Sequence, residues 1–90
     1  MPAKKYELYI KTSARKEMRN LPKDVLQGVH RAIRSLRQEP RPRGCRKVRG
    51  REGAWRIVVR KDYRVLYMVD DTAWRIEIYS VARREKDTYR

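Results

Sequence analysis

The second half of the chain contains the stretch Asp62-Tyr63-Arg64-Val65-Leu66-Tyr67, in which a basic residue stands among apolar ones. Side chains alternate between the two faces of a strand, so this segment can pack one face on a core and present the Arg64 guanidinium on the other. The preceding stretch, Trp55-Arg56-Ile57-Val58-Val59-Arg60, places Arg56 in the same way. We therefore expect a site on the strands rather than a uniformly basic coat.

The loop between these two strands determines which side chains share a face. We assign it three residues, Arg60-Lys61-Asp62, which pairs Val59 with Tyr63 and puts Arg56 on the same face as Arg64. A two-residue loop would put the two arginines on opposite faces. The expected strands cover residues 55–60, 63–70 and 74–81, and the turn residues Asp70-Asp71-Thr72-Ala73 join the last two as a hairpin.

The start of the chain predicts another strand and a short helix. Residues 6–11 alternate between apolar and polar positions, which is typical of a half-buried strand. Thr12 and Ser13 can cap a helix that runs through Arg19. Pro22 then stops this helix, because the residue before a proline is barred from helical dihedral angles.

A second, longer helix follows. It ends near Glu39, because Pro40 and Pro42 cannot continue it. Its apolar positions recur every three to four residues and form one stripe, made by Val25, Leu26, Val29, Ile33 and Leu36. The sequence thus predicts an α+β fold: a small antiparallel sheet of about four to five strands, with two N-terminal helices packed on one face, in β-α-α-β-β-β order.

The charge of the chain narrows the classes of partner. It carries 25 Lys and Arg against 11 Asp and Glu, a formal net charge of +14 on 90 residues. A charge of this size favours nucleic acid as the partner, with a generic basic surface as the alternative. A chain this short cannot bury two separate cores, so we expect one domain over residues 1–90.

Other residue types suggest a reducing compartment and chemistry without histidine. Cys45 is the only cysteine and cannot form an intramolecular disulfide. No apolar stretch resembles a signal peptide or a membrane span, so we expect a cytoplasmic protein. His30, the only histidine, lies beside the apolar stripe of the second helix and is expected to be a helix-surface or packing group. No metal site is visible.

Several motifs together resemble the RelE branch of the RelE/ParE toxin superfamily. They are Lys47-Val48-Arg49-Gly50, Trp55-Arg56-Ile57, Asp62-Tyr63-Arg64-Val65-Leu66-Tyr67, and Arg84 followed by Tyr89. The resemblance covers almost the whole chain. It implies a toxin of a type II toxin–antitoxin system that acts as a metal-independent, ribosome-dependent endoribonuclease. Such a toxin cleaves mRNA in the ribosomal A site, arrests translation and uses no cofactor.

The resemblance also implies roles for individual residues. Arg64 would neutralise the scissile phosphate, Arg84 would stabilise or protonate the 5′-oxygen leaving group, and Tyr89 would stack on a base or take part in proton transfer. The 2′-hydroxyl of the RNA is the nucleophile, so the protein must supply in-line geometry, charge stabilisation and proton transfer. Further RNA contacts are expected from Lys47, Arg49, Arg56, Arg60 and Arg83.

The general base stays open, because Val58 stands where relatives often have a second basic residue. The candidates are Tyr89, ribosomal RNA, solvent, or no discrete base at all, with Glu52 as a weaker candidate. Two other functions also stay open. One is a ParE-like inhibitor of DNA gyrase, and the other is a non-catalytic basic RNA-binding module, in which Arg64 would matter no more than Lys16.

The expected partners follow from the same resemblance. They are a RelB-like antitoxin, the 70S ribosome and mRNA, without a membrane or a small-molecule ligand. The antitoxin is expected to be partly disordered and to offer acidic and apolar groups. The second helix and the edge of the first strand are its expected docking surfaces.

Overall fold

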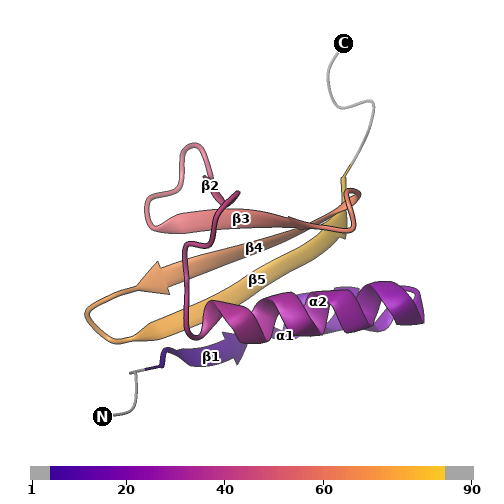
Figure 1. Ribbon diagram of the computed structural model, residues 1–90, viewed down its shortest axis with the longest axis horizontal. Coiled ribbons are helices and arrows are strands. Elements are labelled where there is room, and N and C mark those ends of the chain that lie inside the picture. The colour runs from indigo at the N-terminus through magenta and orange to yellow at the C-terminus, as the bar shows by residue number, and fades with distance from the viewer. Residues whose placement is uncertain (1–4, 85–90) are drawn as a thin grey trace.

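Two helices lie on one side of a five-stranded sheet in the computed structural model, which describes residues 5–84 (Figure 1). In chain order the elements are β1 (Glu7–Ile10), α1 (Thr12–Arg19), α2 (Lys23–Leu36), β2 (Arg46–Lys47), β3 (Ala54–Val59), β4 (Tyr63–Asp70) and β5 (Arg75–Arg83). The α+β class and the placement of both helices on one face are confirmed, whereas the predicted β-α-α-β-β-β order lacked the two-residue strand β2.

The sheet is mixed rather than antiparallel. Its strand order is β1-β5-β4-β3-β2, and the neighbours from β5 to β2 are antiparallel. β1, however, pairs with β5 in parallel, with Leu8 opposite Ile76 and Ile10 opposite Ile78. The prediction of a wholly antiparallel sheet was wrong for β1, because the alternation of residues along a strand shows its buried face but neither its partner nor its direction.

The start of α1 and the end of α2 differ from the sequence prediction, whereas α1 ends at Arg19 as predicted. Lys11 is the N-cap of α1, and Thr12 and Ser13 lie inside the first turn without a side-chain cap. α2 ends at Leu36 rather than near Glu39. There the backbone N–H of Tyr6 donates to the carbonyl oxygen of Arg37 at 2.9 Å, so the chain leaves the helix where it meets the start of β1. Neither described helix is long and apolar enough to cross a membrane.

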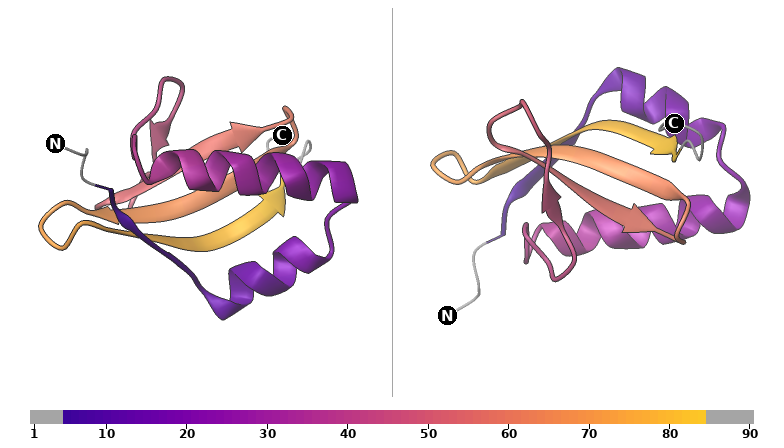
Figure 2. Two further views of the ribbon diagram at one scale, coloured as in Figure 1. Left: turned by 60° about the horizontal axis from the view of Figure 1, so that its bottom comes forward. Right: turned by 90° about the horizontal axis from the view of Figure 1, so that it is seen from above.

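The core fills the space between the helices and one face of the sheet. α1 packs on β5 and α2 packs on β3, and Figure 2 shows both helices on the same side of the strands. The largest fully buried side chains are Tyr67, Ile33, Leu36, Ile76, Ile78, Val29, Val65 and Val81. Since both helices cover this face, the opposite face of the sheet is left open to a ligand.

A three-residue turn joins β3 to β4, as predicted. Val59 pairs with Tyr63, Val58 with Arg64, and Arg56 with Leu66. Arg60 and Lys61 reach this geometry with positive φ angles of 54° and 68°, a backbone region that residues other than glycine rarely occupy. The register places Arg56 and Arg64 on the open face.

The last strand contains an irregularity that the sequence did not reveal. β5 runs from Arg75 to Arg83, two residues beyond the predicted end at Val81, and Trp74 belongs to the preceding turn with a φ of 55°. Leu66 pairs with Ser80 and Tyr67 with Ile78, so Tyr79 is an extra, unpaired residue of β5. This is a β-bulge, which can redirect a side chain.

Candidate functional site

Four arginines meet in one cavity on the open face of the sheet. Arg46 and Arg49 come from β2 and the chain after it, Arg56 from β3 and Arg64 from β4. The cavity has a volume of about 640 Å³ and is lined by Arg46, Lys47, Val48, Arg49, Arg56, Arg64 and Leu66, which we call the arginine cleft. The strand register explains the convergence, because Arg46 pairs with Arg56 and Arg64 lies on the next strand.

The arginine cleft is a site of concentrated positive charge. No acidic residue lines it. Among residues 5–84 the ion pairs are Arg41–Asp71 and Arg60–Asp24, and neither uses an arginine of the cleft. Guanidinium groups stay charged at neutral pH and present a planar fork to phosphate oxygens. The cleft can therefore bind an RNA phosphate through several charge-assisted hydrogen bonds.

The arginines of the cleft alternate with aliphatic side chains. Val58 lies directly opposite Arg64 and is 44% exposed, while Leu66 lies opposite Arg56. Apolar neighbours exclude water from part of the surface, and Coulomb interactions are stronger where water is excluded. Of these two residues only Leu66 lines the cleft, and it favours binding of an anion beside Arg64.

Arg84 lies near the cleft but does not line it. It follows the end of β5, where its backbone N–H donates to the carbonyl oxygen of Asp62, and its Nη1 donates to that of Lys61 at 3.5 Å. Ala82, two residues before it, pairs with Arg64. The turn after β3 therefore holds Arg84 at the same end of the sheet as Arg64. Tyr89 falls outside the described residues.

Three further residues were predicted to contact RNA, and only one of them, Lys47, lines the cleft. Lys47 lines the arginine cleft, and its Nζ lies 5.9 Å from the ring centroid of Trp55. Arg60 instead forms an ion pair with Asp24 of α2, on the helix side of the sheet. Arg83 pairs in register with Tyr63, on the same face as the buried Val65. Neither Arg60 nor Arg83 joins the cleft.

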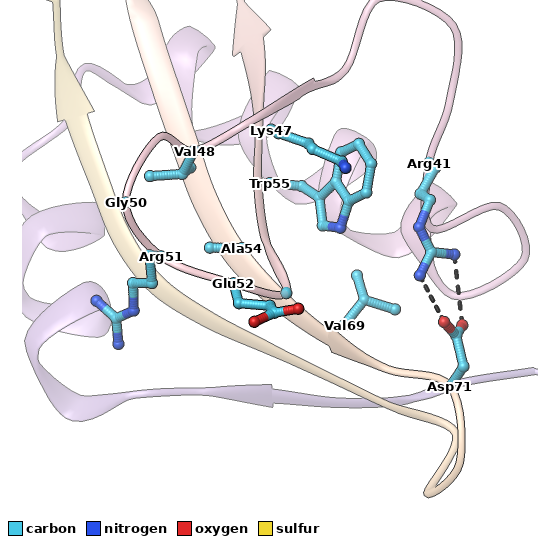
Figure 3. Close-up of a pocket in the computed structure, with 11 residues that line it drawn as sticks. Arg41, Lys47, Val48, Gly50, Arg51, Glu52, Ala54, Trp55, Val69 and Asp71 are labelled. Carbon is cyan, nitrogen blue, oxygen red and sulfur yellow. Dashed lines mark hydrogen bonds and ion pairs between the residues drawn. The ribbon is translucent and has the colours of Figure 1, made fainter.

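A second cavity lies next to the arginine cleft and was not expected from the sequence (Figure 3). It has a volume of about 690 Å³ and shares Lys47 and Val48 with the cleft. We call it the Trp55 pocket; the rest of its lining is Arg41, Gly50, Arg51, Glu52, Gly53, Ala54, Trp55, Val69 and Asp71. The guanidinium carbon of Arg41 lies 5.3 Å from the centroid of the Trp55 ring, so cations already approach this indole from Arg41 and Lys47.

Asp71 joins distant parts of the chain at the edge of the Trp55 pocket. Arg41 donates to its carboxylate at 2.6 Å, and the hydroxyl of Tyr6 donates to the other oxygen, also at 2.6 Å. Donation from Arg41 and then from Tyr6 holds the pKa of Asp71 below its ordinary value. The same hydrogen bond to Asp71 raises the pKa of Tyr6. This network stabilises the wall of the pocket and leaves Arg41 neutralised.

Neither His30 nor Cys45 lines the arginine cleft. His30 is exposed on α2 and lines a small apolar groove with Ile10, Met18 and Leu26, which agrees with its expected place on the helix surface. Cys45 is a free, partly buried thiol. Within residues 5–84 no group of three or more His, Cys, Asp or Glu side chains could hold a metal ion.

Sequence reasoning missed Arg46 as a member of the cleft. Its neighbour Lys47 was predicted and also lines the cleft, but from the other face of β2, since Arg46 pairs with Arg56 and Lys47 with Trp55. The only signal in the sequence would have been the alternation of side chains along β2. This strand has two residues, which are too few to show such a pattern.

The chain matches a known toxin family over most of its length. Residues 8–88 match the family described as the ParE toxin of the type II toxin–antitoxin system, parDE. No curated protein sequence matches the chain.

Several solved toxin structures share the fold. One is the toxin–antitoxin complex RelBE2 from Mycobacterium tuberculosis, with 31% identity, a TM-score of 0.76, and coverage of 92% of this chain and 95% of that one. The isolated Escherichia coli RelE toxin has 27% identity, a TM-score of 0.79, and coverage of 92% and 88%. The archaeal RelE–RelB complex from Pyrococcus horikoshii has 28% identity, a TM-score of 0.75, and coverage of 90% and 97%.

The fold, the family match and these structures together define a toxin of a type II toxin–antitoxin system. The chain belongs to the ParE toxin family within the RelE/ParE superfamily, and its similarity to solved RelE toxins confirms the resemblance to the RelE branch.

Proposed function

We propose that this toxin is a ribosome-dependent endoribonuclease that cleaves mRNA in the ribosomal A site and so arrests translation. The observation that carries the proposal is the arginine cleft, where Arg46, Arg49, Arg56 and Arg64 meet without an acidic residue in the lining. The three solved structures compared above are of RelE toxins or their complexes, and this favours the RelE activity over inhibition of DNA gyrase.

The cleavage that we propose uses the RNA as its own nucleophile. The 2′-oxygen attacks the adjacent phosphorus, the bond from phosphorus to the 5′-oxygen breaks, and the products carry a 2′,3′-cyclic phosphate and a 5′-hydroxyl. One proton leaves the 2′-hydroxyl and one is delivered to the 5′-oxygen. Negative charge grows on the phosphoryl oxygens in between, and Arg64, with Arg56 on the neighbouring strand, would stabilise it.

The proton transfers belong to groups around this centre. Arg84, held beside Asp62 at the end of β5, would stabilise the 5′-oxygen as it leaves. Tyr89 would orient a base or pass a proton. We assign no general base, because the aliphatic Val58 lies opposite Arg64. Ribosomal RNA, solvent or Tyr89 would take the proton from the 2′-hydroxyl, while Glu52 lines the Trp55 pocket and not the cleft.

The partners follow from the same proposal. An antitoxin restrains the toxin, as expected for a type II system whose solved relatives include complexes with RelB. The ribosome and mRNA would be the target, which places the protein in the cytoplasm. The shallow groove of about 190 Å³ beside Ile10, Met18, Leu26 and His30 offers an apolar surface between β1 and the helices for the antitoxin.

The test is cleavage of a defined messenger in a translating extract, with primer extension to map the cuts. We expect the native chain to cut within ribosome-occupied codons and to leave the naked messenger intact. Arg64→Ala should lower the rate by about 100-fold or more, the usual effect of removing one donor that stabilises a transition state. Arg64→Lys should retain part of the activity, because it keeps the charge but loses the planar fork.

The matched control is Lys16→Ala, which removes the same charge from an exposed position on α1. We expect it to cut like the native chain, and Tyr89→Ala to cut more slowly. A messenger that stays whole while translation continues would contradict the ribonuclease, and a gyrase supercoiling assay would then test the ParE-like function. Equal losses in Arg64→Ala and Lys16→Ala would instead indicate a general effect of positive charge.

A further inference from the structure

One contact ties β2 and the loop after it to the distant strand β5. We call residues 46–53 the hairpin; they carry Arg46 and Arg49 of the arginine cleft. The guanidinium carbon of Arg51, in the loop between β2 and β3, lies 4.2 Å from the ring centroid of Tyr79 on β5. In sheet order β3 and β4 lie between these partners. Figure 3 shows Arg51 beside the yellow ribbon of β5. The contact therefore spans the open face of the sheet.

The contact lies at the bulge in β5. Tyr79 is the residue without a partner in β4, between Ile78 and Ser80. Ile78 is fully buried on the helix side, whereas Tyr79 is only partly buried and does not belong to the core cluster. A bulge of this kind redirects a side chain. Tyr79 therefore faces the open side of the sheet, where its ring lies against the Arg51 guanidinium.

The hairpin is closed by its own backbone hydrogen bonds, among them Val48 N–H to the carbonyl oxygen of Ala54 at 2.9 Å, but few contacts attach it to the strands beyond β3. β2 consists of two residues at the edge of the sheet, and they pair only with Arg56 and Trp55. The loop that follows turns through Gly50 and Gly53, both with a φ of 81°. Arg46 and Arg49 lie on this hairpin, whereas Arg56 and Arg64 lie on the longer strands β3 and β4. One wall of the arginine cleft is thus fixed and the other is attached weakly.

We propose that Arg51 and Tyr79 form a clasp that sets the position of Arg46 and Arg49 in the arginine cleft. Tyr79 is then a positioning residue for RNA: it acts through Arg51 and touches no reacting atom. Loss of the clasp lets the hairpin move away from β3 and β4, which weakens the grip on the RNA backbone. The rate at the scissile phosphate beside Arg64 stays the same. The kinetic part of this inference rests on the proposed ribonuclease function.

The first test needs no ribonuclease activity. Over residues 46–53, amide hydrogen exchange of the free toxin should be faster in Tyr79→Leu than in the native chain. The expected factor is about two- to fivefold, which corresponds to the loss of one exposed cation–π contact. Exchange in β4 should be unchanged. Tyr79→Phe keeps the ring and should restore native exchange. Arg51→Gln, at an exposed position, should reproduce the effect of Tyr79→Leu.

The second test separates binding from chemistry. In the ribosome-programmed cleavage assay Tyr79→Leu should raise KM by about two- to fivefold and leave kcat at the native value. This change removes no charge, so a lost ionic contact with RNA cannot explain it. The matched control is Tyr9→Leu, which removes a similar contact between Arg75 and the Tyr9 ring, 5.2 Å apart, on β1. It should leave both KM and kcat unchanged.

The two tests give distinguishable failures. Native exchange over residues 46–53 in both Tyr79→Leu and Arg51→Gln would overturn the clasp, whatever the toxin cleaves. A fall in kcat at constant KM would overturn its positioning role. If the native chain itself leaves the messenger whole, the proposed function fails, while the exchange measurement still decides whether the clasp exists.

Discussion

Asp71 is the residue through which three distant segments meet. It accepts hydrogen bonds from Arg41, after α2, and from Tyr6, before β1, while Asp71 itself lies in the turn between β4 and β5. The side chains of Arg41 and Asp71 remain 36% and 56% exposed. Solvent therefore screens this pair, and its contribution to stability is small.

Protonation of Asp71 should remove that contribution. Its folded pKa lies below the ordinary value of 3.8, because Arg41 and Tyr6 donate to the carboxylate. A depressed carboxyl pKa stabilises the folded state above the unfolded pKa, and this stabilisation is lost as pH falls through the folded pKa. We expect Asp71→Asn to melt a few degrees below the native chain at pH 7, and the gap to close by about pH 2.

The measurement is thermal unfolding followed by circular dichroism between pH 2 and pH 7. Asparagine suits the turn as well as aspartate does, so the substitution tests the charge and not the backbone. Glu39→Gln removes one negative charge from an exposed residue that forms no ion pair within residues 5–84, and it should show a smaller gap. A gap for Asp71→Asn that stays constant with pH would contradict the assignment.

At the scale of elements, the turn between β3 and β4 fixes the register of the cleft. Arg60 and Lys61 both have positive φ angles, which costs about 1–2 kcal/mol for each residue that has a Cβ atom. Arg60 is also held by its ion pair with Asp24. The side chain of Lys61 has no described partner within residues 5–84, so its backbone conformation is held by the pairing of the strands and by the hydrogen bond that Arg84 donates to its carbonyl oxygen.

Lys61→Gly should therefore stabilise the protein. Glycine relieves the strain at positive φ, but it also increases the entropy of the unfolded chain by about 0.5–1 kcal/mol. The net gain is about 0.5–1 kcal/mol, which raises Tm by a few degrees in a domain of this size. Lys61→Ala is the control: it removes the same charge and keeps the Cβ atom, so Tm should not rise. Equal Tm values for the two variants in a melting experiment would show that the turn is not strained.

The sequence was sufficient for elements whose pattern is local. The alternation around Arg56 and Arg64 predicted their strands, and the three-residue turn placed both arginines on one face, as the pairing of Val59 with Tyr63 confirms. The parallel pairing of β1, the bulge at Tyr79 and the early end of α2 depend instead on segments far apart in the chain. Local periodicity contains no information about such contacts.

At the scale of the whole molecule, the same limit applies to the site. Of the basic residues predicted to bind RNA, Lys47, Arg49 and Arg56 line the arginine cleft with Arg64. Arg60 and Arg83 lie on the helix side, and Arg46 joined the cleft unpredicted. Charge alone cannot separate these residues, because the chain has a net charge of +14 and basic side chains occur on every described helix and strand except β1. The folded strands decide which of them act together.

The salt dependence of RNA binding should distinguish a cleft from a generic basic surface. Each phosphate neutralised on a single strand contributes about 0.7 to the slope of log K against log salt concentration, because binding releases a counterion. If RNA lies in the arginine cleft, Arg56→Ala or Arg64→Ala should reduce the slope by about 0.7, whereas Lys16→Ala on α1 should not change it. Fluorescence anisotropy of a labelled single-stranded RNA, titrated at several KCl concentrations, measures the slope directly. Equal slopes for Arg64→Ala and Lys16→Ala would mean that RNA binds the basic surface of this chain, whose net charge is +14, without preference for the cleft. That result would contradict the cleft as the binding site.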